Sequence, residues 1–156
     1  DRYIPSGLHL APLLDACGAA GIKLNSSNIL PSVGEALPTE EGVLTVDFGR
    51  IMIPTNRDGH PFMLNFDQQM AWVKGEGGDG MTSAEETLYI LLRAWLELDR
   101  MPFMGGWIRC RNAGGSDRSL GVDWLVDCGL CVGSDRRDDT GWGWGAIPRQ
   151  FRQIGN

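Results

Sequence analysis

The most reactive side chains of this chain are its cysteines, and two of them stand three positions apart. The segment Cys128-Gly-Leu-Cys131 has the CxxC spacing of zinc knuckles and of thioredoxin-type redox sites. Both kinds of site hold the pair in a turn or at a helix start, whereas the residues around this pair alternate as in a strand. Since positions three apart in a strand face opposite sides, we expect Cys128 in the core and Cys131 on the other face, as structural cysteines without a metal. A metal or redox role for Cys128 and Cys131 is the alternative, and a turn at Gly129 would favour it.

A glycine-rich segment, residues 75–80, fits the pattern G-x-G-x-x-G and stands before a helical segment. A dinucleotide site needs a strand before this pattern and room for an anionic pyrophosphate. Here a short helix is expected before the loop, and the loop carries Glu76 and Asp79. The sequence therefore favours a surface connector over a nucleotide site, and we expect no cofactor.

The only imidazole bases are His9 and His60. His60 follows a turn that contains Asp58, and Asp47 belongs to a neighbouring strand pattern, so a hydrolytic cluster is one hypothesis. The chain has no Gly-x-Ser-x-Gly elbow and no paired-His metal motif. Because Pro61 comes next, His60 is more simply interpreted as a turn residue.

Arginines beside aromatic residues could form an anion-binding or nucleic-acid surface. Arg109 and Arg111 are expected on the same side of one strand. Asp135, Asp138 and Asp139 flank a later arginine pair and cancel much of its charge, so we favour a solvated surface there. The arginines towards the C-terminus are Arg136, Arg137, Arg149 and Arg152.

Tryptophans near the C-terminus give the best functional lead. Trp142 and Trp144 share one side of an expected strand, while Gly141, Gly143 and Gly145 leave its other side bare. A bare side lets a backbone, a helix or a flat ligand approach closely. The favoured alternative is that both indoles are core residues and the glycines face a packed helix. A ligand or partner surface, if there is one, is expected to draw on Trp142, Trp144, Arg149, Arg109, Arg111 and His60.

Three helical patterns would position these side chains. A short helix is expected within 12–21, since Pro12 suits a first turn and Gly21 a C-terminal cap. A second is expected at 67–73, capped by Asp67. The clearest helix spans 82–100 behind a Thr82-x-x-Glu85 capping box. Its apolar face holds Leu88, Leu91, Leu92, Trp95 and Leu98.

Strand patterns account for most of the remaining chain. They are expected at 44–53, at 60–66 after a turn at 57–59, and at 107–111, 122–132 and 141–146. The fold class is therefore α+β. We expect a single domain over 1–156, with a helical or irregular segment at 1–42 and the sheet and main helix at 43–156. The sheet is expected to be antiparallel, with about five strands and one main helix packed on it.

Composition and charge limit the function further. The net charge is −6 and the pI about 4.8, which disfavours nucleic acid and anionic membranes as partners. No apolar run approaches the roughly 20 residues that span a bilayer. Four cysteines are too few for a disulfide-dense secreted scaffold, so a cytoplasmic location is expected, with a secreted domain of two bridges as the alternative.

The segment GWGWGAIPRQF at 141–151 resembles the GWCWAGNPHTW-type ending of an actinobacterial domain family of unknown function. The segment MTSAE at 81–85 likewise resembles the LTIEE helix start of that family. The resemblance covers about 52–151 and implies a shared fold and a bacterial origin, without an activity. The Cys, Asn and His of the family correspond here to Gly143, Ile147 and Arg149, so their chemistry does not carry over.

These observations favour a non-catalytic binding or protein-interaction domain of unknown specificity. No constellation supplies a nucleophile, a base and an oxyanion stabiliser together. The partner is an unknown protein or small molecule, and a homo-oligomer stays open. The alternative is an enzyme or small-molecule-binding protein with a pocket between the tryptophan hairpin and the 75–80 glycine loop. A cleft that joins Cys131, His60 and an Asp would favour the enzyme, and a flat apolar patch with Trp142 or Trp144 would favour partner binding.

Overall fold

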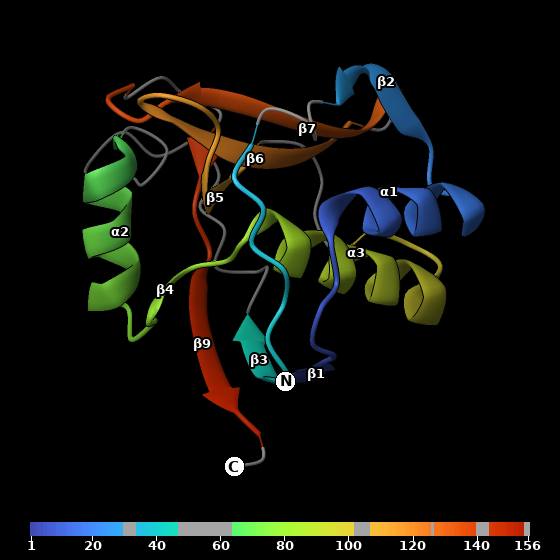
Figure 1. The fold of residues 1–156 in the computed structure, drawn as a ribbon, viewed down its shortest axis with the longest axis horizontal. Helices are drawn as coiled ribbons and strands as arrows, with labels where there is room; N and C mark the ends of the chain where they lie inside the picture. The colour runs from blue at the N-terminus through green and yellow to red at the C-terminus, as the bar shows by residue number, and fades with distance from the viewer. Residues whose placement is uncertain (30–33, 47–63, 102–106, 126, 140–143, 155–156) are drawn as a thin grey trace.

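A computed structural model of the chain describes residues 1–29, 34–46, 64–101, 107–125, 127–139 and 144–154. Within these ranges the chain is α+β, with three helices and two sheets (Figure 1). None of the helices in the described ranges is long and apolar enough to span a bilayer.

The first sheet has four antiparallel strands in the order β1-β3-β9-β4. The strand β3 is paired along its whole length with β9, from Gly42 opposite Gln153 to Val46 opposite Arg149. The first and the last strand of the chain therefore meet in one sheet, each beside β3 (Figure 1). The bounds of its strands are β1 Arg2–Ile4, β3 Gly42–Val46, β4 Gly80–Met81 and β9 Pro148–Gln153.

The second sheet has five strands in the order β2-β7-β6-β5-β8. Its three central strands form an antiparallel meander, whereas β2 and β8 lie parallel to their neighbours at the two edges. The bounds are β2 Leu24–Ile29, β5 Trp107–Ala113, β6 Arg118–Leu125, β7 Gly129–Arg136 and β8 Trp144–Gly145.

The expectation of one antiparallel sheet of about five strands is therefore wrong. The chain crosses between sheets immediately after β8, because Gly145 pairs with Ile108 in one sheet and Pro148 pairs with Met81 in the other. Alternation along a sequence tells which residues face the same side of a strand. It does not tell which strand lies alongside.

A continuous strand over 122–132 is also wrong. The strand β6 ends at Leu125, and β7 begins at Gly129, directly opposite it in a hairpin. Gly129 has a φ of 96°, and a Cβ there would stand 2.5 Å from the carbonyl oxygen of Lys23, so a glycine is required at this position. Val122 and Val132 are paired across the hairpin and both lie in the core, which explains why the alternation continued through the turn.

The three helices are α1 Leu10–Ala19, α2 Phe66–Gly75 and α3 Ala84–Leu98. Asn65 caps α2 rather than Asp67, since its side chain accepts the backbone N–H of Gln68 and the Gln68 side chain accepts the N–H of Asn65. The cap of α3 is the same kind of capping box one residue later than expected. Ser83 and Glu86 form it, with distances of 3.0 and 2.9 Å.

The helix α3 packs against both sheets. Leu88 and Leu91 belong to the main core with the inner face of the five-stranded sheet, and Ile90 belongs to a smaller core with Ile4 and Leu44 of the four-stranded sheet. Apolar side chains on two stripes of the helix are thereby removed from water. Figure 1 shows α1 and α3 side by side beneath the five-stranded sheet.

Candidate functional site

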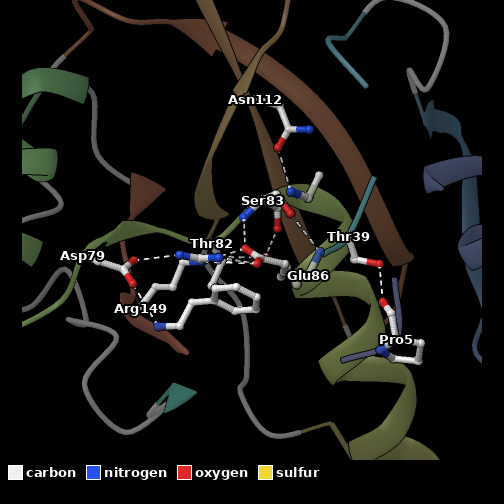
Figure 2. A network of polar contacts seen from close by, with 11 residues as sticks. Pro5, Thr39, Asp79, Thr82, Ser83, Glu86, Asn112 and Arg149 are labelled. Carbon is white, nitrogen blue, oxygen red and sulfur yellow. Dashed lines mark hydrogen bonds and ion pairs between the residues drawn. The ribbon is translucent and has the colours of Figure 1, made fainter. Parts of the chain in front are cut away.

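Arg149, which we expected on a surface, lies instead in a polar network at the start of α3 (Figure 2). Its Nη2 is 2.7 Å from Oε2 of Glu86, and its Nε is 3.0 Å from Oε1. The two side chains are only 13% and 3% exposed. Burial by itself would lower the pKa of Arg149, but the hydrogen bonds and charges of Glu86 and Asp79 outweigh it and raise the pKa.

Asp79 ties the glycine-rich segment to the same arginine (Figure 2). One oxygen of Asp79 lies 2.7 Å from Nη1 of Arg149, and the other accepts the backbone N–H of Phe151 at 2.8 Å. A Cβ on Gly78 would lie 2.9 Å from the backbone nitrogen of Arg149. The 75–80 segment therefore packs closely on β9. In the alternative of an enzyme or small-molecule-binding protein, this segment would form one wall of the pocket.

Glu85, the neighbour of Glu86, is fully buried and equally well satisfied. Its two oxygens accept the backbone N–H of Leu37 and the Nδ2 of Asn112, both at 2.8 Å. Asn112 in turn accepts the N–H of Ala84 at 2.7 Å. Since donors of the chain itself bind these carboxylates, the network joins the start of α3 to β5 and β9.

Arg109 and Arg111 do not share one surface, contrary to the expectation. Arg109 is fully buried, and its Nη2 lies 3.4 Å from the backbone oxygen of Asp139. Arg111 is exposed. The pairing of β5 with β6 shifts register between Arg109 and Ala113, and such an irregularity interrupts the simple alternation. Burial lowers the pKa of Arg109, while the charges of Asp135 and Asp139 oppose that shift.

The two cysteines of the CxxC segment lie in different elements, the hairpin turn and β7. Cys128 lies in the turn and is exposed, not in the core as expected, whereas Cys131 lies in β7 and is buried. Cys131 stands opposite Asp123 in register. In the part of the chain that the structure describes, no three His, Cys, Asp or Glu side chains are grouped so that they could hold a metal ion.

Other expected site residues lie outside the described ranges. These are Trp142 and His60, together with Asp47 and Asp58 of the hydrolytic cluster. Trp144 begins β8, and its backbone pairs in parallel with that of Trp107. Of the expected surface residues, the structure therefore places only Arg109, Arg111, Arg149 and the backbone of Trp144.

A pocket of about 630 Å³ lies elsewhere, where the start of α2 approaches the turn before β6 and the end of β7. The approach is fixed by the backbone, because the N–H of Phe66 donates to the carbonyl of Arg137 at 2.9 Å. The N–H of Arg137 donates in turn to the carbonyl of Asp117 at 2.8 Å. The lining residues are Asn65, Asp67, Ser116, Asp117, Arg118, Arg136, Arg137 and Asp138.

Arg118 and Arg136 stand opposite each other in the β6–β7 hairpin and project from the same face. Arg118 is anchored on Ser134, with its Nε 2.9 Å from the hydroxyl and its Nη2 2.8 Å from the carbonyl oxygen. Arg136 binds Asp138 through two hydrogen bonds, Nε to Oδ1 at 3.0 Å and Nη2 to Oδ2 at 2.8 Å. These hydrogen bonds and the Asp138 charge raise the pKa of Arg136.

The third arginine of the pocket, Arg137, is held by an aromatic ring. Its guanidinium carbon lies 3.9 Å from the centroid of Phe66, and its Nη2 lies 3.9 Å from Oδ1 of Asp67. Three arginines and three aspartates thus meet in one concave surface. The described residues that line it include no histidine, cysteine or lysine, and its charged groups are these arginines and aspartates.

The sequence pattern predicted a solvated surface at Arg136 and Arg137 and gave no role to Arg118. The available signal was the turn at 114–117, since it places Arg118 at the start of a strand whose hairpin partner ends at Arg136.

No family model matches the chain, and neither a curated protein nor a solved structure matches it.

Proposed function

We propose that this chain is a non-catalytic binding domain and that a small polar ligand occupies the pocket between α2 and the β6–β7 hairpin. The observation that carries the proposal is the convergence of Arg118, Arg136 and Arg137 on a concavity of about 630 Å³. A volume of this size is typical of small-molecule sites. The ligand contacts are charge-assisted hydrogen bonds, which give orientation and specificity.

The ligand carries groups of both charge signs. The pocket holds equal numbers of arginines and aspartates, so a ligand of one sign would leave an uncompensated charge of the other. A ligand with an anionic and a cationic or hydrogen-bond-donating end can pair with both sets. Amino acids and short peptides have this chemistry.

The test is an NMR titration of the uniformly ¹⁵N-labelled chain with free amino acids and dipeptides. We expect shifted backbone signals to cluster at 65–67, 116–118 and 136–138. The double substitution Arg118→Gln and Arg136→Gln is expected to abolish the shifts. Arg152→Gln, which removes the same type of charge from an exposed position of β9, is the matched control and should leave binding unchanged. Binding that is indifferent to the double substitution, or no binding at all, would reject the pocket.

Protein interaction is the second candidate function. Large apolar side chains remain exposed on β1, at the end of α3 and after β9, and single exposed positions such as these are weaker evidence than a pocket. Concentration-dependent light scattering would detect self-association, which also tests the homo-oligomer. The exposed residues are Tyr3, Leu96, Leu98 and Ile154, with exposed fractions of 50%, 57%, 57% and 37%.

We also propose a cytoplasmic location and a relationship to the actinobacterial family. The four cysteines are free, which supports a reducing cytoplasmic location. The relationship of 141–151 to the actinobacterial family also remains a proposal, and it adds no activity to the binding role. An enzyme that uses Cys131, His60 and an Asp has less support, because Cys131 is fully buried.

A further inference from the structure

The carboxylate of Asp138 binds the guanidinium of Arg136 in the way that a carboxylate ligand would. Both of its oxygens are engaged, one by Nε at 3.0 Å and the other by Nη2 at 2.8 Å. This two-bond arrangement is the one that arginine makes with planar carboxylates in binding sites. On the basis of the proposed function, we propose that the anionic group of the ligand is a carboxylate and that it displaces Asp138 from Arg136.

The displacement demands little from the fold. Arg136 and Asp138 are 67% and 70% exposed, and ion pairs between such exposed side chains contribute little to stability. The two residues are also separated by a single position, so their contact ties no distant parts of the chain together. The Arg149–Glu86 pair is the opposite case, since both partners are buried and joined across the fold.

A carboxylate suits the exchange better than a phosphate. It carries one negative charge, so it replaces the charge of Asp138 without adding another beside Asp67 and Asp117. Ser134 holds Arg118 on the same face. Arg118 therefore adds a second positive charge next to the Arg136 guanidinium that Asp138 has left. A phosphate with its larger charge would face stronger repulsion from the two remaining aspartates.

The test is Asp138→Asn, which removes the internal competitor and leaves the other lining residues in place. The probe is acetate, which carries a single carboxylate, titrated at constant ionic strength and followed by the Nε–H signals of the arginine side chains. We expect Asp138→Asn to bind acetate about two- to fivefold more tightly than the wild type. Inorganic phosphate should show a smaller gain. Asp15→Asn, which removes the same charge from an exposed position of α1, should show none.

The outcomes separate this inference from the proposed function. If amino acids bind at the pocket with the expected arginine dependence, but acetate binds Asp138→Asn no better than the wild type, the internal-competitor idea is wrong and the binding role stands. An equal gain for Asp15→Asn, or a larger gain for phosphate than for acetate, also overturns the inference. If neither protein binds any of these compounds at the pocket, both proposals fail.

Discussion

The guanidinium of Arg149 and the carboxylate of Glu86 form a two-bond ion pair in the interior, with Nη2–Oε2 at 2.7 Å and Nε–Oε1 at 3.0 Å. This pair connects β9 with the first turn of α3. Removal of the arginine would leave Glu86 buried without its countercharge, which typically costs 3–5 kcal/mol. We expect Arg149→Gln to lower the free energy of unfolding by about 3 kcal/mol, measured by urea denaturation.

The control for Arg149→Gln is an arginine with the same charge and an exposed partner. Arg93 is paired with Glu97 at 3.0 Å, four residues along α3, and both side chains are about 40% exposed. Arg93→Gln should cost no more than about 0.5 kcal/mol. Losses of similar size in the two variants would contradict the special role of the buried pair.

Local signals predicted the bounds of the three described helices to within two residues, because apolar periodicity depends on residues within one or two turns, but they misplaced the caps of α2 and α3. The α3 cap was placed one residue early since Thr82–Glu85 and Ser83–Glu86 both fit the capping-box pattern. Other hydrogen bonds of Glu85 and Thr82 decide between them, since the oxygens of Glu85 accept from Leu37 and Asn112. The hydroxyl of Thr82 hydrogen-bonds that of Thr87 at 2.9 Å, so Ser83 is left to cap the helix.

The arrangement of the strands could not be predicted in the same way. The strand β2 has the sequence LNSSNI, without alternation, and it is a strand because it pairs in parallel with β7. The strands β8 and β9 are separated by two residues and belong to different sheets. Pairing is a non-local choice, and a pattern within one strand carries little information about it.

The candidate site was missed for a related reason. Arg136 and Arg137 were interpreted as a surface pair neutralised by nearby aspartates, and that charge pairing is present. What the sequence does not contain is the approach of α2, which turns the surface into a pocket. Arg109 shows the reverse error, since a charged residue in a strand suggests solvent and this one is fully buried.

A second prediction concerns Gly78, whose Cβ position is already filled by backbone. A methyl group there would stand 2.9 Å from the nitrogen of Arg149 and 3.0 Å from its oxygen. Backbone atoms cannot move aside as a flexible side chain can, so Gly78→Ala should cost about 1–3 kcal/mol of stability in thermal or urea unfolding.

Gly75 gives the matched comparison within the same glycine-rich segment. It ends α2, and a Cβ on it would meet nothing within 4 Å. Gly75→Ala should therefore be neutral or stabilising by up to about 1 kcal/mol, because alanine favours the helical conformation. If Gly78→Ala proved as harmless as Gly75→Ala, the close packing of this segment on β9 would be refuted.

A third prediction concerns the thiols. Cys128 is exposed, whereas Cys17, Cys110 and Cys131 are buried. Burial raises the pKa of Cys110 to about 12 and that of Cys17 to about 11, so neither forms much thiolate near neutral pH. We expect iodoacetamide at about pH 8 to add one group to the native protein, as counted by intact mass spectrometry.

The same labelling distinguishes the sites. Cys128→Ser should abolish the native adduct, and labelling in urea should modify all four cysteines of the wild type. Two rapid adducts on the native protein would show that a second cysteine is accessible. That result would restore the CxxC pair as a candidate for redox chemistry.

The last prediction concerns Asp123, a carboxyl of β6 that is 2% exposed. Its Oδ1 is buried without a hydrogen-bond partner among the described residues. Burial raises the pKa of Asp123 above its ordinary value of 3.8, although the backbone N–H of Trp124 opposes the shift. The native state therefore binds this proton more tightly than the unfolded chain does.

The sign of the pH dependence follows from that difference. The stability contributed by Asp123 is fully present below pH 3.8 and is lost as the pH rises through the raised pKa. Asp123→Asn keeps the shape without the charge, so it should be more stable than the wild type at pH 7, by about 1 kcal/mol. The advantage should shrink when urea unfolding is measured near pH 3.5, whereas the exposed Asp15→Asn should show no such trend. An advantage of equal size at both pH values would mean that Asp123 titrates alike in the folded and unfolded chains.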